Sequence, residues 1–225
     1  PLPEDAPSIA ADLRATGYAT ALIGKAHFEP LLDPFLRFTE NRMGAHRSTN
    51  ENPNDPHRGF DHMELATHGA AGALHYSQWI RDNHPEAVMN YYRVLDNELQ
   101  VNAEGGGDTK APQVHVNPIP TDWYHTEWVA QRTIAWLESL PADRDWFCWM
   151  SFPDPHHPWD PPASEMHRVR WQDLDLPENY IANSTTREAV LDDKLRHWRG
   201  WYDGTFVSNY EAPARWVPAT LTQDQ

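Results

Sequence analysis

The chain has 225 residues, a formal net charge of −15, 40% hydrophobic residues and 12% aromatic residues, which is enough apolar material for one packed domain. Its 33 acidic residues against 18 basic ones exclude nucleic acid and anionic membranes as expected partners, because phosphate groups bind basic surfaces. No apolar run is long enough to span a bilayer. The single Cys148 rules out an internal disulfide and is expected to be a buried core thiol.

The first segment predicts a helix followed by a strand. Residues 5–16 carry apolar side chains among helix formers and favour a short amphipathic helix, which Gly17 would end. Residues 18–23 are rich in β-formers and predict a buried strand. A helix, a glycine, a strand and a polar loop form the α/β pattern, in which ligands bind at the carboxyl ends of the strands.

Lys25 and His27 follow that strand and stand two residues apart. In an extended segment, residues i and i+2 point to the same side. A cation and an imidazole would therefore point to the same side of the chain, an arrangement suited to binding an anion.

The middle of the chain, residues 29–122, is rich in loops, with polar turn clusters at 50–56 and 105–108. Within it, residues 73–81 and 87–99 are interpreted as helices. The segment gives no repeat and no low-complexity linker, so its loops are expected to be functional.

A second helix and strand follow. Thr126 is predicted to cap a helix over 126–140, and residues 146–152 predict an apolar strand buried on both faces of a parallel sheet. A proline-rich loop with His156 and His157 comes directly after this strand. A further helix is expected around 187–201.

A histidine in such a loop can act as a general acid near neutral pH or as a metal ligand. His156 and His157 are adjacent and are expected to point in different directions, so only one needs to face a site. They lack the i, i+4 spacing of a helical zinc pair, and no cysteine cluster supports a zinc site.

Two of these segments resemble the sulfatase family of the alkaline-phosphatase-like superfamily. Residues 8–27, ending in Gly24-Lys25-Ala26-His27, are similar to a family signature in which a helix and a strand lead into Gly-Lys-x-His. Residues 152–158 resemble the family's later His-x-Pro loop, and the tail from Asn209 resembles bacterial members. The resemblance covers most of the chain, thinly between residues 45 and 120.

The resemblance implies an α/β fold, in which a mainly parallel sheet is flanked by helices and long proline-rich loops. Residues 1–225 would be a single partial domain, the central segment of a sulfatase catalytic domain. It also implies that Lys25 and His27 contact the sulfate of a small anionic ester. His156 would assist departure of the leaving group, and His157 is assigned no role.

The resemblance further implies a formylglycine nucleophile, made from Cys or Ser in a Cys/Ser-x-Pro/Ala-x-Arg motif, and a Ca²⁺ ion. The motif is absent from the chain, since Cys148 is followed by Trp149, Met150, Ser151 and Phe152. Nucleophile and calcium ligands are expected outside these 225 residues, which begin Pro1-Leu2-Pro3 without Met. The isolated chain is therefore expected to have no turnover.

Three alternatives stay open. A phosphonate monoester or phosphodiester hydrolase of the same superfamily would use similar chemistry. A non-catalytic binding module could use the eleven Trp residues as stacking platforms, although core packing explains Trp136, Trp146 and Trp149 better. An unrelated histidine-based metalloenzyme is the third. The organic part of the substrate, the localisation and the oligomeric state are left open.

Overall fold

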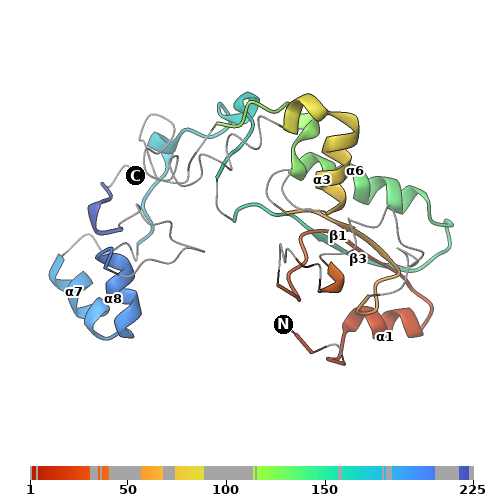
Figure 1. The fold of residues 1–225 in the computed structure, drawn as a ribbon, viewed down its shortest axis with the longest axis horizontal. Coiled ribbons are helices and arrows are strands. Elements are labelled where there is room, and N and C mark those ends of the chain that lie inside the picture. Colours follow the sequence, from red (N-terminus) through yellow and green to blue (C-terminus); the bar gives the residue numbers. More distant parts are fainter. Residues whose placement is uncertain are drawn as a thin grey trace. The chain divides into compact units, whose positions relative to one another are not determined.

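The computed structural model of the chain describes residues 2–3, 5–30, 35, 37–40, 57–67, 74–88, 114, 116–156, 159–178, 180, 184–205 and 218–222. The chain divides into two compact units, residues 1–93 with 119–157 and residues 94–118 with 158–225. Figure 1 draws both units. The single partial domain expected from the sequence stays a prediction.

The first unit is built on a parallel sheet, whose described strands have the order β2–β1–β3. These are β1 (Ala19–Gly24), β2 (His62–Leu65) and β3 (Trp146–Ser151). In the register of the sheet, Gly24 at the end of β1 lies opposite Leu65 at the end of β2 and Ser151 at the end of β3. The α/β fold class is confirmed, and the carboxyl ends of the described strands meet at one edge.

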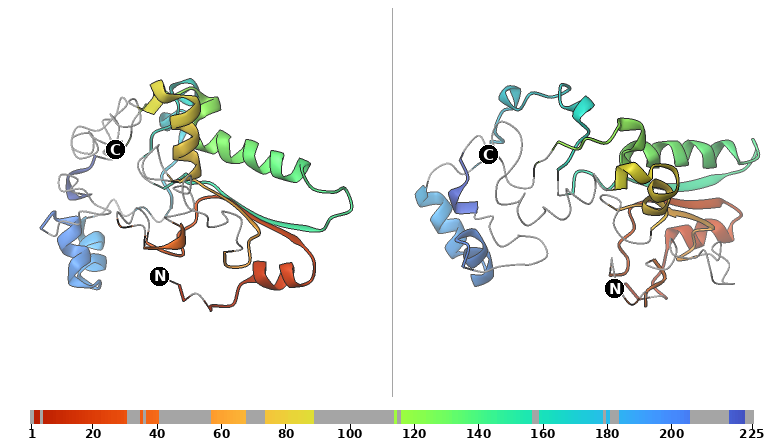
Figure 2. Two further views of the ribbon diagram at one scale, coloured as in Figure 1. Left: turned by 45° about the vertical axis from the view of Figure 1, so that its right-hand side comes forward. Right: turned by 45° about the horizontal axis from the view of Figure 1, so that its top comes forward.

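Helices cover both faces of this sheet. On one face, Ala21 and Ile23 of β1 pack against α3 (His75–Asn83) and α6 (His125–Glu138). On the other face, Leu22 packs with Ala10 of α1 (Ile9–Ala15). This alternation follows the two-residue period of a strand. Both views in Figure 2 show α1 on the opposite side of the strands from α3 and α6.

The expected starts of two helices are wrong by a few residues. The first helix begins at Ile9, not at Asp5, and Ser8 at its N-cap donates its hydroxyl to the carbonyl of Arg58 at 2.7 Å. The helix α6 begins at His125, so Thr126 lies in its first turn and does not cap it. The Thr126 hydroxyl, which the sequence assigns to capping, instead makes a tertiary hydrogen bond to Asp154. The stop at Gly17 is confirmed, with φ +100°.

The strand at residues 146–152 is confirmed, but its expected burial on both faces is wrong. Trp146 is 51% exposed and Trp149 is 44% exposed, whereas Trp136 of α6 is only 8% exposed. In the described sheet β3 is an edge strand with β1 on one side only, so it lies at the rim of the layer of helices that covers β1. Core packing therefore explains Trp136 and does not explain Trp146 and Trp149.

The second unit contains two short helices, α7 (Ser184–Asp192) and α8 (Arg196–Tyr202), where the sequence predicts one. The guanidinium of Arg199 on α8 binds Glu188 and Asp192 of α7, the latter at 2.6 Å, so the two helices fold back on each other. Elsewhere in this unit, Asn117 donates its side-chain amide to Asp160 at 3.0 Å.

The remaining described elements are short 3₁₀ turns: η1 (Thr121–Trp123), η2 (Ala163–Glu165), η3 (Trp171–Asp173) and η4 (Pro218–Thr220). The helix expected at 73–81 is confirmed as α3, and most of the one expected at 87–99 lies outside the described residues. None of the helices in the described part of the chain combines the length and apolarity that a bilayer crossing requires.

Candidate active site

Main-chain hydrogen bonds join the residues that follow β1 and β2 to the ends of neighbouring strands, at the carboxyl edge of the sheet. The N–H of Lys25, directly after β1, donates to the carbonyl of Ser151 at 2.8 Å, and the N–H of Ala66, directly after β2, donates to the carbonyl of Gly24 at 2.9 Å. The segments that carry Lys25 and the histidine loop after β3 therefore leave the sheet from one place.

Burial alternates along the segment after β1. Lys25 is half-buried, Ala26 is buried and His27 is exposed, a pattern that fits an extended segment with Lys25 and His27 on the same side. Burial lowers the pKa of the Lys25 ammonium, because the charged form loses hydration. This lysine is not a fully solvated surface cation.

His156 lies in the turn that follows β3. Its N–H donates to the carbonyl of Pro153 at 3.2 Å, and its side chain is exposed. His157 lies outside the described residues. The structure brings the segments of Lys25 and His156 to one edge of the sheet, and the chemical roles of Lys25, His27 and His156 stay predictions.

A polar contact missed by the sequence analysis holds the histidine loop. Thr126 donates its hydroxyl to Asp154 Oδ2 at 3.0 Å, and Nε2 of the fully buried His125 lies 3.9 Å from Asp154 Oδ1. Burial raises the pKa of Asp154, against the hydrogen bonds from Thr126 and Tyr124, which lower it. The start of α6 thus fixes the residue two positions before His156. In an α/β unit, the helix before a strand begins at the strand's carboxyl edge, and that rule could have found the contact.

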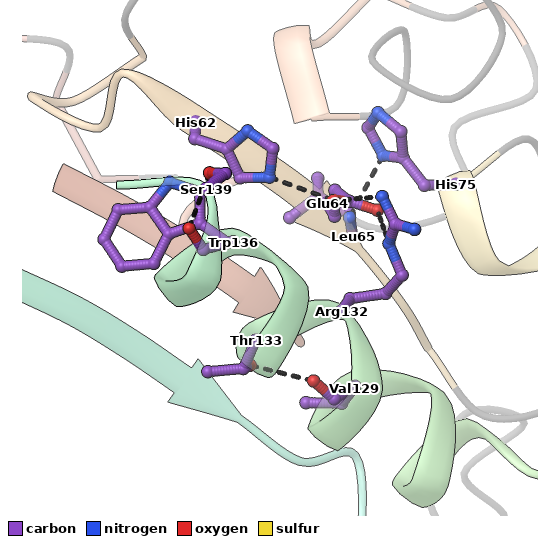
Figure 3. Close-up of polar contacts among 9 residues, drawn as sticks. All are labelled: His62, Glu64, Leu65, His75, Val129, Arg132, Thr133, Trp136 and Ser139. Atoms are coloured by element: carbon purple, nitrogen blue, oxygen red, sulfur yellow. Dashed lines mark hydrogen bonds and ion pairs between the residues drawn. The ribbon is translucent and has the colours of Figure 1, made fainter. Parts of the chain in front are cut away.

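An ion pair ties α6 to β2 in turn (Figure 3). Arg132 of α6 donates to both carboxylate oxygens of Glu64 at 2.6 and 2.9 Å, and His62 Nε2 lies 2.9 Å from Oε1 of the same carboxylate. Burial alone would raise the pKa of Glu64, but the hydrogen bonds from His62 and Arg132, with the charge of Arg132, lower it to about 2. The next residue along β2, Leu65, donates its N–H to His75 Nδ1 of α3 at 3.0 Å.

Cys148 belongs to the core and not to the site. It lies on β3 opposite Ala21, half-buried against the cluster beneath α3 and α6. Burial raises the pKa of its thiol to about 11. A thiol of this kind is a poor nucleophile at neutral pH; the expected contact with the core is found, but the thiol is half-buried and not fully buried.

The sequence and the fold of the chain were compared with those of known proteins. No family model matches the chain. It is 26% identical over 192 residues to an arylsulfatase of Clostridium perfringens, an alignment that covers 80% of the chain. Its fold matches a phosphonate monoester hydrolase from Silicibacter pomeroyi with a TM-score of 0.51 and 18% identity, over 94% of the chain. The arylsulfatase match supports a relationship between this chain and the sulfatases of the alkaline-phosphatase-like superfamily.

The arylsulfatase match supports a hydrolase at the level of the superfamily, and the structural match, at 18% identity, shows a shared fold alone. The chain spans about a third of each: 33% of the arylsulfatase and 37% of the phosphonate monoester hydrolase. The resemblance to the sulfatases expected from the sequence is thereby supported for the chain as a whole, and the assignment of the Gly-Lys-x-His and His-x-Pro segments stays a prediction.

The candidate residues Lys25, His27 and His156 do not make a calcium site. Calcium takes about six to eight oxygen ligands, whereas the side chains of these three residues carry no oxygen, and the nearby carboxylate of Asp154 already accepts a hydrogen bond from Thr126. No step of the chemistry is therefore assigned to calcium through these residues.

Proposed function

We propose that this chain forms the sulfate-binding and leaving-group part of a sulfuric ester hydrolase. Lys25 and His27 bind the sulfate of a small anionic ester, and His156 protonates the oxygen of the departing alcohol or phenol. The observation that carries the proposal is the 2.8 Å hydrogen bond from the Lys25 N–H to the Ser151 carbonyl, because it brings the two candidate segments to the same edge.

Each residue has a distinct task in this proposal. Lys25 supplies a fixed positive charge, and its partial burial strengthens its attraction to the anion, because a lower local dielectric screens charge less. Such charges stabilise the negative charge that develops in the transition state. His27 donates a hydrogen bond to a sulfate oxygen.

His156 gives its proton to the bridging oxygen as the S–O bond breaks, so the leaving group departs neutral. The contact of Asp154 with Thr126 holds the turn from which His156 projects. The formylglycine nucleophile and the calcium site are proposed to come from residues outside this chain. The 225 residues alone are accordingly proposed to lack turnover.

The test uses the protein that carries this chain and two aryl sulfates, one with a good leaving group and one with a poor one. His156→Ala is expected to lower kcat/KM by about 10²-fold or more for the poor leaving group and much less for the good one, because only the poor one needs a proton. Lys25→Ala is expected to lower both equally, by about 10²-fold. His197→Ala, at an exposed position on α8, is the matched control and should leave both rates unchanged.

Hydrolysis of phosphonate monoesters is the second candidate function, favoured by the fold match to a phosphonate monoester hydrolase. The ratio of kcat/KM for an aryl sulfate to that for a phosphonate monoester decides between them, and we expect it to exceed one. A ratio far below one would reverse the assignment. Aryl sulfate hydrolysis by the 225 residues alone, if it survived Lys25→Ala, would contradict the roles of Lys25, His27 and His156.

A further inference from the structure

A second cluster of polar side chains lies close to the segment that follows His27. Carboxylate oxygens of Glu29 and Glu40 and a ring nitrogen of His57 all lie within 4.8 Å of one another. Glu29 and Glu40 are buried, and Glu40 has no exposed surface at all. These three residues come from separate segments of the chain, so tertiary folding alone brings them together.

The backbone fixes each member of the cluster. The N–H of Glu29 donates to Glu40 Oε2 at 3.2 Å, and the N–H of Glu40 donates to Glu29 Oε2 at 2.9 Å. Each carboxylate thus uses one oxygen to accept a hydrogen bond from the main-chain N–H of the other glutamate. His57 enters a tight turn, closed by hydrogen bonds of 3.2 and 3.0 Å with Phe60, in which Arg58 and Gly59 both have positive φ.

The second carboxylate oxygen of Glu40 accepts no hydrogen bond from the residues that the structure describes. Glu40 Oε1 and His57 Nε2 are buried and lack hydrogen-bond partners among the residues that the structure describes. They face each other at 3.6 Å, beyond the range of a hydrogen bond. A buried polar atom in this state carries an energetic penalty unless something else binds it.

The charges of the cluster also favour a cation. Of the two buried carboxylates, Glu29 lies near a guanidinium, with Arg58 Nη2 3.9 Å from Glu29 Oε1. Arg58 is shared with other acceptors: its Nη1 and Nη2 donate to the carbonyls of Pro3 and Leu2, each at 2.9 Å. With a neutral His57, the charge of Glu40 has no ion-pair partner among the described residues, at a place where an unpaired charge is costly.

We propose that Glu29, Glu40 and His57 bind a divalent transition-metal ion, of the Zn²⁺ or Mn²⁺ class, that clamps the segment after β1. Mixed carboxylate and imidazole ligands suit these ions, and imidazole disfavours Ca²⁺. Bonds of about 2.0–2.2 Å place the ligand atoms about 3.5 Å apart in a tetrahedral site. The pair formed by Glu40 and His57 already has this spacing. This site is separate from the calcium site that the sulfatase resemblance implies, and it does not rest on the proposed function.

The test measures metal content and binding in the untagged chain. After dialysis against a chelator, titration with Zn²⁺ or Mn²⁺ is expected to show one tight equivalent, unaffected by millimolar Ca²⁺. Glu40→Gln keeps the size and hydrogen-bonding oxygen of the side chain but loses its charge, and His57→Gln loses the ring nitrogen. Each is expected to weaken this equivalent by at least about tenfold, since each removes one of three ligands. His62→Gln, in another Glu–His pair, is the matched control and should bind like the wild type.

Thermal unfolding supplies a second readout. The ion should raise the Tm of the wild type and of His62→Gln, because a ligand that binds only the folded state stabilises it, and it should leave the Tm of the two cluster variants unchanged. Should Glu40→Gln fail to fold, His57→Gln decides alone. The proposal is overturned if the wild type binds no equivalent, or if both cluster variants bind as the wild type does. The first result would identify a metal-free polar cluster, and the second an adventitious surface site.

Discussion

A Cβ atom on Gly24 would lie 1.7 Å from the carbonyl oxygen of Ser151. Gly24 also has φ +111°, in the left-handed region that side chains disfavour. The backbones of β1 and β3 therefore touch directly before Lys25, and glycine is required there for two independent reasons. The candidate site begins at a place where no side chain fits.

Substitution of two glycines separates the effect of the backbone clash from that of the positive φ. Gly24→Ala is expected to cost at least about 2–3 kcal/mol in the free energy of unfolding, because it adds a backbone clash to the positive φ. Gly17→Ala is the control, since Gly17 has φ +100° but no atom within 4 Å of its Cβ position. It should cost about 1 kcal/mol. Urea unfolding of both variants provides the comparison, and equal costs would show that contact with Ser151 does not constrain position 24.

The local pattern of the sequence was enough to predict the frame of the first unit. The apolar pattern of residues 18–23 and 146–152 predicts two strands, and Gly17 predicts the end of the first helix. The burial of β3 carries no such signal. Trp146 and Trp149 read as core residues, yet they lie on an edge strand of the described sheet, and position in a sheet is a property of the whole fold.

The ion pair between Glu64 and Arg132 predicts a stability change in acid. The pKa of Glu64 is lowered from 4.5 to about 2 in the folded chain. The pair therefore stabilises the fold above pH 4.5, and this contribution is lost as the pH falls toward 2. Because Arg132 is 44% exposed, we expect a contribution of only about 1–2 kcal/mol.

Glu64→Gln should accordingly lower the free energy of unfolding by that amount at pH 7. The difference from the wild type should shrink between pH 4.5 and pH 2, as the wild-type carboxylate becomes protonated. Glu138→Gln, at an exposed position near the end of α6, is the control and should have little effect at any pH. A deficit for Glu64→Gln that persists unchanged at pH 2 would show that packing, and not charge, sets its contribution.

Site residues that follow a strand can be predicted from the sequence, whereas contacts between distant loop positions cannot. Lys25 and His156 lie in the loops that follow two predicted strands, so the rule for α/β sheets selects them. The contact between Thr126 and Asp154 joins residues 28 positions apart. The cluster of Glu29, Glu40 and His57 joins three loop positions. Such pairs depend on how loops fold over the sheet, which no periodic pattern encodes.

The thiol of Cys148 should be unreactive in the native chain. Its pKa of about 11, raised by burial, leaves little thiolate at pH 8. Alkylation by iodoacetamide at that pH is expected to be about 100-fold slower than in urea, because only the thiolate reacts. Mass spectrometry of the labelled chain measures both rates, and Cys148→Ser is the blank. Equal rates in buffer and in urea would show that the strand opens readily.

The contact between Thr126 and Asp154 predicts a pH-dependent effect on the loop that carries His156. Burial raises the pKa of Asp154, so this carboxyl favours the folded state most below pH 3.8, and that contribution is lost as the pH rises through its folded pKa. Above that pH the ionised carboxylate depends on its donors. Thr126→Val removes one donor and is expected to cost about 1 kcal/mol at pH 7 and less at pH 3.

A double-mutant cycle with Asp154→Asn assigns this effect to the carboxylate. If the Thr126 hydroxyl acts on the charge of Asp154, adding Thr126→Val to Asp154→Asn should give a small cost that is the same at pH 3 and pH 7. In the protein that carries this chain, Thr126→Val should also slow hydrolysis of the aryl sulfate with the poor leaving group more than the one with the good leaving group, since it loosens the turn before His156. A cost of Thr126→Val that does not vary with pH in the wild-type background would mean that the hydroxyl supports α6 itself, and the histidine loop would then need another support.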